Sequence, residues 1–176
     1  MTLNSFQFNT TPSIRFGSDQ AKDSCKEIST KLGERILFIT DKGLMTLGLT
    51  DPTIKELQKN GSVEVFDDVE ADPSQKTLLN AIEIGKKIKA TGVIGFGGGS
   101  SMDVAKLSAL ILGSNENLDE AWGVANAKGP RLPLVLIPTT AGTGSEVTPI
   151  SIITVGEEEK KGVSSSLILP DLAILD

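Results

Sequence analysis

Residues 92–112 read GVIGFGGGSSMDVAKLSALIL, and this stretch carries the clearest structural pattern of the chain. Its first five residues form a short apolar run, which is typical of a strand buried on both faces of a sheet. Three glycines follow. From about Ser101 to Leu112 the sequence is apolar nearly all round, which indicates a helix packed against a sheet. The stretch therefore predicts a buried strand, a glycine-rich loop and a buried helix in direct succession.

The same alternation of strand-like and helix-like segments continues on both sides. Apolar residues at helical spacing predict helices over 18–33, with Cys25 on the buried face, over 52–60, capped by Asp51, and from 72–74 onward. Short apolar runs predict strands over 35–40, 63–66 and 134–137, and a closing pair over 150–154 and 163–169 around a charged turn at 156–161. Strands and helices that alternate in this way form βαβ units with right-handed crossovers. We therefore expect an α/β, Rossmann-like parallel sheet flanked by helices, with residues 1–176 in a single domain.

Composition excludes several kinds of chemistry. The chain has no His and one Cys, so a Ser-His-Asp triad, a His-ligated metal site and an internal disulfide cannot form within it. Its 17 Lys and Arg are scattered against 23 Asp and Glu, which argues against a nucleic-acid partner. No apolar run is long enough to cross a bilayer, and the N-terminus does not resemble a signal peptide. We expect a protein of the cytoplasm with no membrane partner.

The glycine loop lies where doubly wound sheets bind ligands, beyond the carboxyl end of a strand and before a helix N-terminus. Gly97, Gly98 and Gly99 lack side chains that would hold a phosphate away from the backbone, and Ser100 adds a hydroxyl donor. Gly95, Gly97 and Ser100 match the spacing of the dinucleotide fingerprint only approximately, because Ser replaces its last Gly. The alternative is a tight turn in which glycine serves only close packing.

Two aspartates near the expected sheet edge have two interpretations each. Asp103 follows the loop closely and either caps the helix, which spacing favours, or accepts a hydrogen bond from a ribose or substrate hydroxyl. Asp41 follows the predicted strand 35–40 directly. A carboxylate there can bind both hydroxyls of an adenosine ribose and repels a 2′-phosphate, whereas the simpler interpretation is a turn or helix-capping residue.

A second loop, Pro138–Thr148, is rich in Gly and Thr and offers many hydroxyl donors with little steric bulk. Because polar residues are common in turns, the alternative is a loop without a binding role. The segment Glu157–Lys161 is most simply a solvated turn, from which one Lys is free to reach a phosphate.

Two motifs together point to a family: Gly97-Gly98-Gly99-Ser100-Ser101-Met102-Asp103-Val104-Ala105-Lys106 and Pro138-Thr139-Thr140-Ala141-Gly142-Thr143-Gly144-Ser145-Glu146. At this separation they resemble the iron-containing (group III) alcohol dehydrogenase family. The likeness extends from Pro12–Gly17 to Pro170–Asp176. It implies the N-terminal domain plan that dehydroquinate synthases share, which binds NAD, followed by a helical domain that holds a divalent metal, usually iron, through one Asp and three His.

The resemblance also assigns roles within the cofactor site. It implies that Gly98, Gly99 and Ser100 hold the pyrophosphate and that Asp41 holds the adenosine ribose, so that NAD is favoured over NADP. The nicotinamide half would be lined by Thr139, Thr140, Thr143 and Ser145. Either Lys160 or Lys161 would reach the cofactor, and Asp103 would approach the cofactor and the catalytic cleft. Asp72 stands where many members have an Asn that touches the adenosine side.

The chain departs from the family pattern at its end, Asp176, because the family's metal ligands come later, in the helical domain. Without His, these residues cannot build the Fe²⁺ site, and Asp176 is not assigned as a ligand. The expected function is therefore that of the cofactor-binding domain of an NAD-dependent alcohol dehydrogenase acting on an alcohol or aldehyde, inactive on its own. Family members often dimerise, so a homodimer is expected from the resemblance.

Two other functions remain open at this level. One is a non-catalytic dinucleotide-binding or self-associating fragment, because loss of a second domain would uncover apolar surface. The other stays within enzymes and follows the related glycerol dehydrogenases. The loop Thr139–Glu146 fits the alcohol dehydrogenase branch better than the glycerol dehydrogenase branch.

Overall fold

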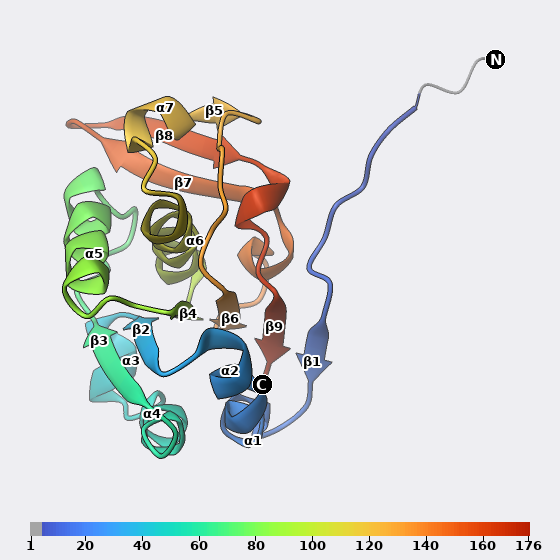
Figure 1. Ribbon diagram of the computed structural model, residues 1–176, viewed down its shortest axis with the longest axis vertical. Coiled ribbons are helices and arrows are strands. Elements are labelled where there is room, and N and C mark those ends of the chain that lie inside the picture. The colour runs from blue at the N-terminus through green and yellow to red at the C-terminus, as the bar shows by residue number, and fades with distance from the viewer. Residues whose placement is uncertain (1–4) are drawn as a thin grey trace.

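A six-stranded parallel sheet forms the centre of the computed structural model, which describes residues 5–176 (Figure 1). Every neighbouring pair of strands in this sheet is parallel, and the expected Rossmann-like α/β fold is therefore confirmed. Across the sheet the strands run in the order β1 (Ile14–Phe16), β9 (Leu172–Leu175), β6 (Leu134–Pro138), β4 (Gly92–Gly97), β2 (Arg35–Ile39) and β3 (Ser62–Phe66).

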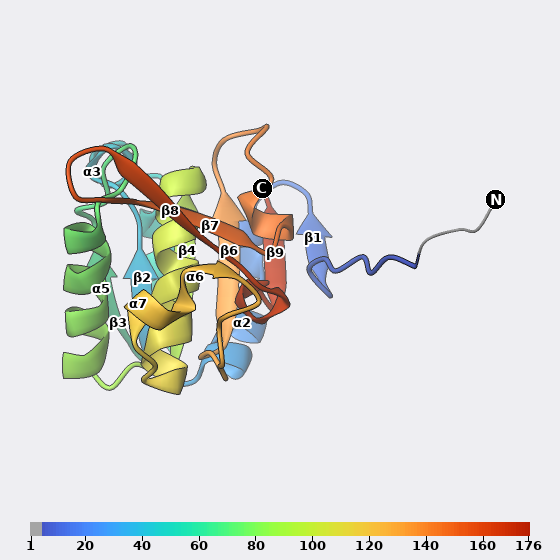
Figure 2. The same cartoon turned by 90° about the horizontal axis from the view of Figure 1, so that it is seen from above.

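Helices cover both faces of this sheet. On one face lie α5 (Gln75–Lys87) and α6 (Gly99–Ser114), which are side by side in both views (Figures 1 and 2). On the other face lie α1 (Gln20–Asp23), α2 (Cys25–Leu32) and α4 (Asp51–Leu57), and Cys25 is fully buried there as expected. Among residues 5–176, none of the helices is long and apolar enough to cross a membrane.

A second, three-stranded sheet lies over α6, with strand order β5 (Gly123–Val124), β8 (Glu159–Ser164) and β7 (Ile150–Val155). Its strands β7 and β8 form an antiparallel hairpin (Figure 1). Ile153 and Val163 from the hairpin are buried in the same core as α5 and α6. Short helices complete the chain: α3 (Lys42–Thr46), α7 (Leu118–Ala121), and the 3-10 turns η1 (Ser145–Val147) and η2 (Ser166–Ile168). The hairpin thus places one more layer above the start of α6.

The structure corrects three of the predicted elements. The helix expected over 18–33 is divided at Ser24 into α1 and α2. Asp51 does not cap α4, because the helix already includes it and its carboxylate pairs with Lys55 one turn later, at 3.2 Å. The strand expected over 163–169 is wrong in its bounds: pairing with β7 begins at Glu159, so Lys160 and Lys161 are strand residues, and η2 follows the strand.

Candidate functional site

The order of the strands reverses between β2 and β4. From β2 the chain passes through α4 to β3 on one side, and then returns through α5 to β4 on the other side of β2. At such a switch point the connections leave in opposite directions, and a crevice opens beyond the carboxyl ends of the two strands. Asp41 follows β2 and Gly98 follows β4, so both residues lie at this crevice.

The glycines in and next to the loop differ in whether the surrounding residues leave room for a side chain. At Gly95 an added Cβ would lie 2.7 Å from Cβ of Ala105, and at Gly97, where φ is 148°, it would lie 2.8 Å from Oγ of Ser101. These two positions fit the packing and turn interpretation. Gly98 has φ −75°, and an added Cβ would make an ordinary contact of 3.5 Å with Oγ1 of Thr140. Among the described residues, packing therefore does not require a glycine at 98, and the backbone there is open to an outside partner.

Helix α6 begins immediately after Gly98, which is its N-cap. Because glycine has no side chain to accept a hydrogen bond, the N–H groups of the first turn are left without a capping side chain. The positive end of the helix dipole lies at the same place. A helix start of this kind attracts anions, phosphate groups in particular.

On one side of the α6 start lies a pocket of about 570 Å³, which we call the Asp41 pocket. Oδ1 of Asp41 accepts a hydrogen bond from the Leu44 N–H at 3.0 Å, so Asp41 caps α3 and also lines the pocket. The capping interpretation of Asp41 is correct, and its carboxylate also faces a pocket in which a ligand could contact it. The lining residues are Asp41, Lys42, Gly43, Leu44, Leu47, Val69, Glu70, Ala71, Gly98, Ser100, Ser101, Thr139 and Thr140.

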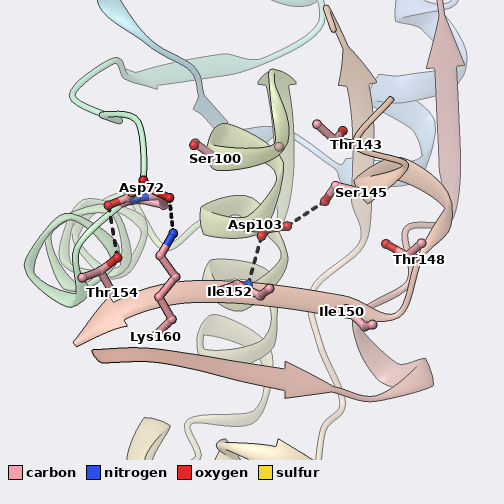
Figure 3. Close-up of a pocket in the computed structure, with 12 residues that line it drawn as sticks. Asp72, Ser100, Asp103, Thr143, Ser145, Thr148, Ile150, Ile152, Thr154 and Lys160 are labelled. Carbon is pink, nitrogen blue, oxygen red and sulfur yellow. Dashed lines mark hydrogen bonds and ion pairs between the residues drawn. The ribbon is translucent and has the colours of Figure 1, made fainter. Parts of the chain in front are cut away.

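On the other side lies a pocket of about 410 Å³ between α6 and the β7–β8 hairpin, which we call the Asp103 pocket (Figure 3). Ser100 lines both pockets, so they meet at the start of α6. The lining residues are Asp72, Pro73, Gly99, Ser100, Asp103, Thr143, Ser145, Thr148, Ile150, Ile152, Thr154 and Lys160.

Asp103 does not cap α6, and the capping prediction was wrong. The helix begins four residues earlier than Asp103, so the carboxylate projects from its second turn toward the second loop and β7. It accepts hydrogen bonds from Oγ of Ser145 at 2.7 Å and from the Ile152 N–H at 2.9 Å (Figure 3). Burial raises the pKa of the Asp103 carboxyl, and the bonds from Ser145 and Ile152 oppose this rise.

Lys106 is the residue that the sequence analysis missed. Its side chain is fully buried, and its ammonium group donates to Oγ of Ser145 at 2.8 Å and to the carbonyls of Thr148 at 2.9 Å and Ile150 at 2.8 Å. The ammonium nitrogen lies 3.9 Å from Oδ1 of Asp103. Burial lowers the pKa of Lys106 to about 8, because the charged form loses its hydration. The available signal was a lysine at the centre of a largely apolar helix, three residues after Asp103.

The two lysines of the hairpin lie differently. Lys160 lines the Asp103 pocket and forms an ion pair with Asp72 across it (Figure 3). Lys161 is the next residue along β8, so its side chain leaves the strand on the opposite face, and it lies 4.0 Å from Glu159. Asp72 therefore lies in the Asp103 pocket and not in the Asp41 pocket.

The hydroxyl residues of the second loop are divided between the two pockets. Thr139 and Thr140 line the Asp41 pocket, whereas Thr143 and Ser145 line the Asp103 pocket. The resemblance had grouped all four on one half of a cofactor. The loop therefore crosses the glycine loop and contributes side chains on both sides of it.

Residues 5–176 contain no group of three or more His, Cys, Asp or Glu side chains able to hold a metal ion. The acidic residues of the Asp103 pocket are engaged in other contacts, Asp103 with Ser145 and Asp72 with Lys160. The described residues thus do not fit an iron site, and no chemical step is assigned to a metal here.

These features define a doubly wound α/β protein with an anion-attracting helix start between two pockets. The family model for iron-containing alcohol dehydrogenases matches residues 11–176, and the chain belongs to that family. It is 39% identical over 162 residues to long-chain-alcohol dehydrogenase 1 of Geobacillus thermodenitrificans, a match that covers 90% of this chain and 40% of the relative. It is 33% identical over 174 residues to the sulfoacetaldehyde reductase of Bilophila wadsworthia, with 97% and 45% covered.

Solved structures agree with this assignment. The crystal structure of a 1,3-propanediol oxidoreductase superposes with a TM-score of 0.92 at 27% identity, covering 98% of this chain and 46% of that chain. The sulfoacetaldehyde reductase of Bifidobacterium kashiwanohense, solved in complex with NAD+, superposes with a TM-score of 0.85 at 31% identity, with 98% and 46% covered. The chain thus spans less than half the length of these relatives.

Proposed function

We propose that this chain forms the NAD-binding part of an oxidoreductase that transfers hydride between NAD and an alcohol or aldehyde. The observation that carries the proposal is Gly98, whose partly exposed backbone lies at the start of α6, where the two pockets meet. NAD supplies the hydride chemistry, and the residues of this chain bind and orient it. This proposed activity is that of an alcohol dehydrogenase, in keeping with the iron-containing alcohol dehydrogenase family to which the chain belongs.

The pyrophosphate of NAD binds at Gly98, Gly99 and Ser100 in this proposal, with Gly97 setting the turn. Backbone N–H groups at the start of α6 would meet the phosphate oxygens, and the helix dipole favours their charge. The adenosine half enters the Asp41 pocket, where Asp41 accepts hydrogen bonds from the ribose hydroxyls. The same carboxylate disfavours NADP, because a 2′-phosphate would place like charges together.

The nicotinamide half enters the Asp103 pocket, which has both polar and apolar walls. Thr143 and Ser145 offer hydroxyl groups, and Ile150 and Ile152 offer apolar surface against which a ring can lie. Thr139 and Thr140 lie on the adenosine side of the glycine loop instead. Lys160 reaches the phosphates from the hairpin, and Lys161 is not assigned a contact.

Activity requires more than residues 5–176. The iron expected for the family has no ligand set among these residues, so we propose that this chain binds nucleotide and does not turn over alcohol by itself. We assign it to the cytoplasm, where a single buried thiol such as Cys25 stays reduced. The choice between an alcohol dehydrogenase and a glycerol dehydrogenase-like enzyme rests on the Thr139–Glu146 loop, which favours the former.

A self-associating role has one specific observation in its favour. Phe6, Phe8 and Phe16 are each more than 80% exposed, and Phe16 lies in the edge strand β1. An edge strand with exposed aromatic side chains is a surface suited to pairing with a second copy. We therefore propose that the chain dimerises through this edge, which leaves the nucleotide site at the carboxyl ends of β2 and β4 free.

Calorimetric titration with NAD tests the binding function, and sedimentation velocity at several concentrations tests self-association. Gly98→Val should lower NAD affinity by at least about tenfold if the phosphates approach this backbone. Unchanged affinity in that variant would remove the glycine loop from the site. Concentration-dependent association without NAD binding would favour the non-catalytic fragment.

A further inference from the structure

Lys106 is buried where a charge is costly. Its side chain lies at the centre of α6, fully excluded from solvent, among residues that are otherwise apolar or small. Removing an ammonium group from water costs several kcal/mol unless hydrogen bonds replace the lost hydration. Its three donors are each matched by one acceptor, on Ser145, Thr148 and Ile150. Because its burial is costly, we expect the ammonium group to have a structural role in holding these acceptors in place.

All three acceptors belong to one short segment, residues 145–150, which runs from the end of the second loop into the start of β7. Ser145, Thr148 and Ile150 also line one wall of the Asp103 pocket (Figure 3). The facing wall includes Gly99 and Ser100, at the start of the helix that carries Lys106. The ammonium group thus ties one wall of the pocket to the helix that forms the other.

We propose that Lys106 is a positioning residue for the nicotinamide half of the cofactor: by holding residues 145–150 against α6, it fixes the shape of the Asp103 pocket. The inference rests on the proposed function, since it presumes that NAD occupies both pockets. Lys106 acts through Ser145 and the loop backbone and does not touch the cofactor. It leaves the Asp41 pocket untouched, because none of its three acceptors lines that pocket.

The charge of Lys106 is part of this role. The ionisable groups that face it are Asp103 on the same helix and Glu146 in η1, both of which favour the ammonium form, and β7 contributes no ionisable side chain. An ammonium group can donate to all three acceptors, whereas a neutral amine has only two N–H groups. Because the pKa of Lys106 is about 8, the hold on the loop weakens as the pH rises above that value.

Two probes separate this role from general structural damage. ADP carries only the adenosine and diphosphate, which belong to the Asp41 pocket and the glycine loop, whereas NAD adds the nicotinamide riboside. We expect Lys106→Met to weaken NAD binding about tenfold while leaving ADP binding within about twofold, as for the loss of one charge-assisted hydrogen-bond anchor. Lys87→Met, which removes an exposed charge from α5, is the matched control and should change neither.

Each outcome of these titrations is decisive. Equal loss of NAD and ADP binding, or no loss of either, would overturn the positioning role while leaving the proposed function standing. Binding of neither ligand by the unaltered chain would instead overturn the proposed function, and this inference with it. If Lys106→Met fails to fold, the unaltered chain provides the test: its affinity for NAD relative to ADP should fall between pH 7.5 and 9.5, and a constant ratio would refute the inference.

Discussion

Asp41 and Gly98 line the same pocket, although they follow different strands and are far apart in the sequence. The reversal of strand order between β2 and β4 brings them together, because adjacent parallel strands end at the same edge of the sheet. Asp41 offers a carboxylate, and Gly98 offers a partly exposed backbone at a helix start, where an added Cβ would make only an ordinary contact. This pairing suits a ligand that has both sugar hydroxyls and phosphates.

Substitution by alanine should lower NAD affinity at Gly98 and lower the stability of the fold at Gly95. Gly98→Ala should change the free energy of unfolding by no more than about 0.5 kcal/mol, because the added methyl group makes only an ordinary contact with Thr140. NAD affinity should nevertheless fall, and Gly98→Val should lower it by at least about tenfold. Gly95→Ala should destabilise the fold by about 1–3 kcal/mol, because its methyl group would meet Ala105 at 2.7 Å.

Urea unfolding and calorimetric titration of the three variants measure these two effects separately. Loss of stability in Gly98→Ala equal to that in Gly95→Ala would show that Gly98 is a packing residue. Its role in ligand binding would then lose its main support.

Asp41→Asn should narrow the preference for NAD over NADP by about tenfold, since the repulsion of a 2′-phosphate requires a charged carboxylate. The substitution leaves the cap of α3 intact, because Asn accepts the Leu44 N–H as well as Asp does. The thermal midpoint should therefore stay nearly constant. Competition titrations with the two cofactors give the ratio, and an unaltered ratio would exclude Asp41 from the ribose site.

Asp72→Asn should strengthen NAD binding a few-fold, because Lys160 would no longer be paired and could meet a phosphate. Asn tolerates the positive φ of 54° at this position, so the backbone is expected to remain as it is. Stability should change by no more than about 0.5 kcal/mol, since both partners of the ion pair are more than half exposed. Calorimetry at low salt measures the affinity, and weaker binding would indicate that Asp72 itself contacts the ligand.

Lys106 should give the folded chain a distinctive dependence of stability on pH. The pKa of Lys106 is about 8 in the folded protein and 10.5 for an unperturbed lysine, so the unfolded chain holds more protons between these two pH values. The free energy of unfolding should therefore rise with pH through this window, by up to about 3 kcal/mol relative to Lys106→Met. Stability rises because burying a neutral amine costs less free energy than burying an ammonium group. The neutral amine nevertheless holds the loop less firmly, because it has one fewer N–H group to donate.

Fluorescence of the single Trp122 follows urea unfolding across this range, and the chain has no Tyr whose ionisation would interfere. Subtracting the Lys106→Met curve removes the contributions of the other lysines. A difference that stays flat or falls from pH 8 to 10.5 would contradict the burial argument.

The central strands β2, β4 and β6 of the sheet could be predicted from the sequence because they are short apolar runs, whereas β1 and β9 were not predicted. Arg35–Ile39, Gly92–Gly97 and Leu134–Pro138 are buried along nearly their whole length, so hydrophobicity alone marks them. The exposed elements carry a weaker signal. Strand β1 is exposed throughout, and β8 begins with charged residues that belong to a strand only because β7 pairs with them.

The candidate site was predictable only in part. The glycine loop follows a buried strand directly, and its position could be read from local sequence. The roles of Asp103 and Lys106 depend on Ser145 and β7, which are some forty residues further along the chain. The spacing of residues within one helix cannot reveal partners that come from a distant part of the chain. Asp103 was therefore expected to cap α6, whereas it accepts a hydrogen bond from Ser145 in the second loop.

Calorimetric titration of the chain with NAD and, separately, with NADP measures whether the switch point between β2 and β4 is a cofactor site. We expect NAD to bind in preference to NADP, with a single site per chain. Binding of neither nucleotide, by a chain that is folded by circular dichroism, would contradict the proposal that the switch point between β2 and β4 is a cofactor site. Preference for NADP would contradict the role of Asp41.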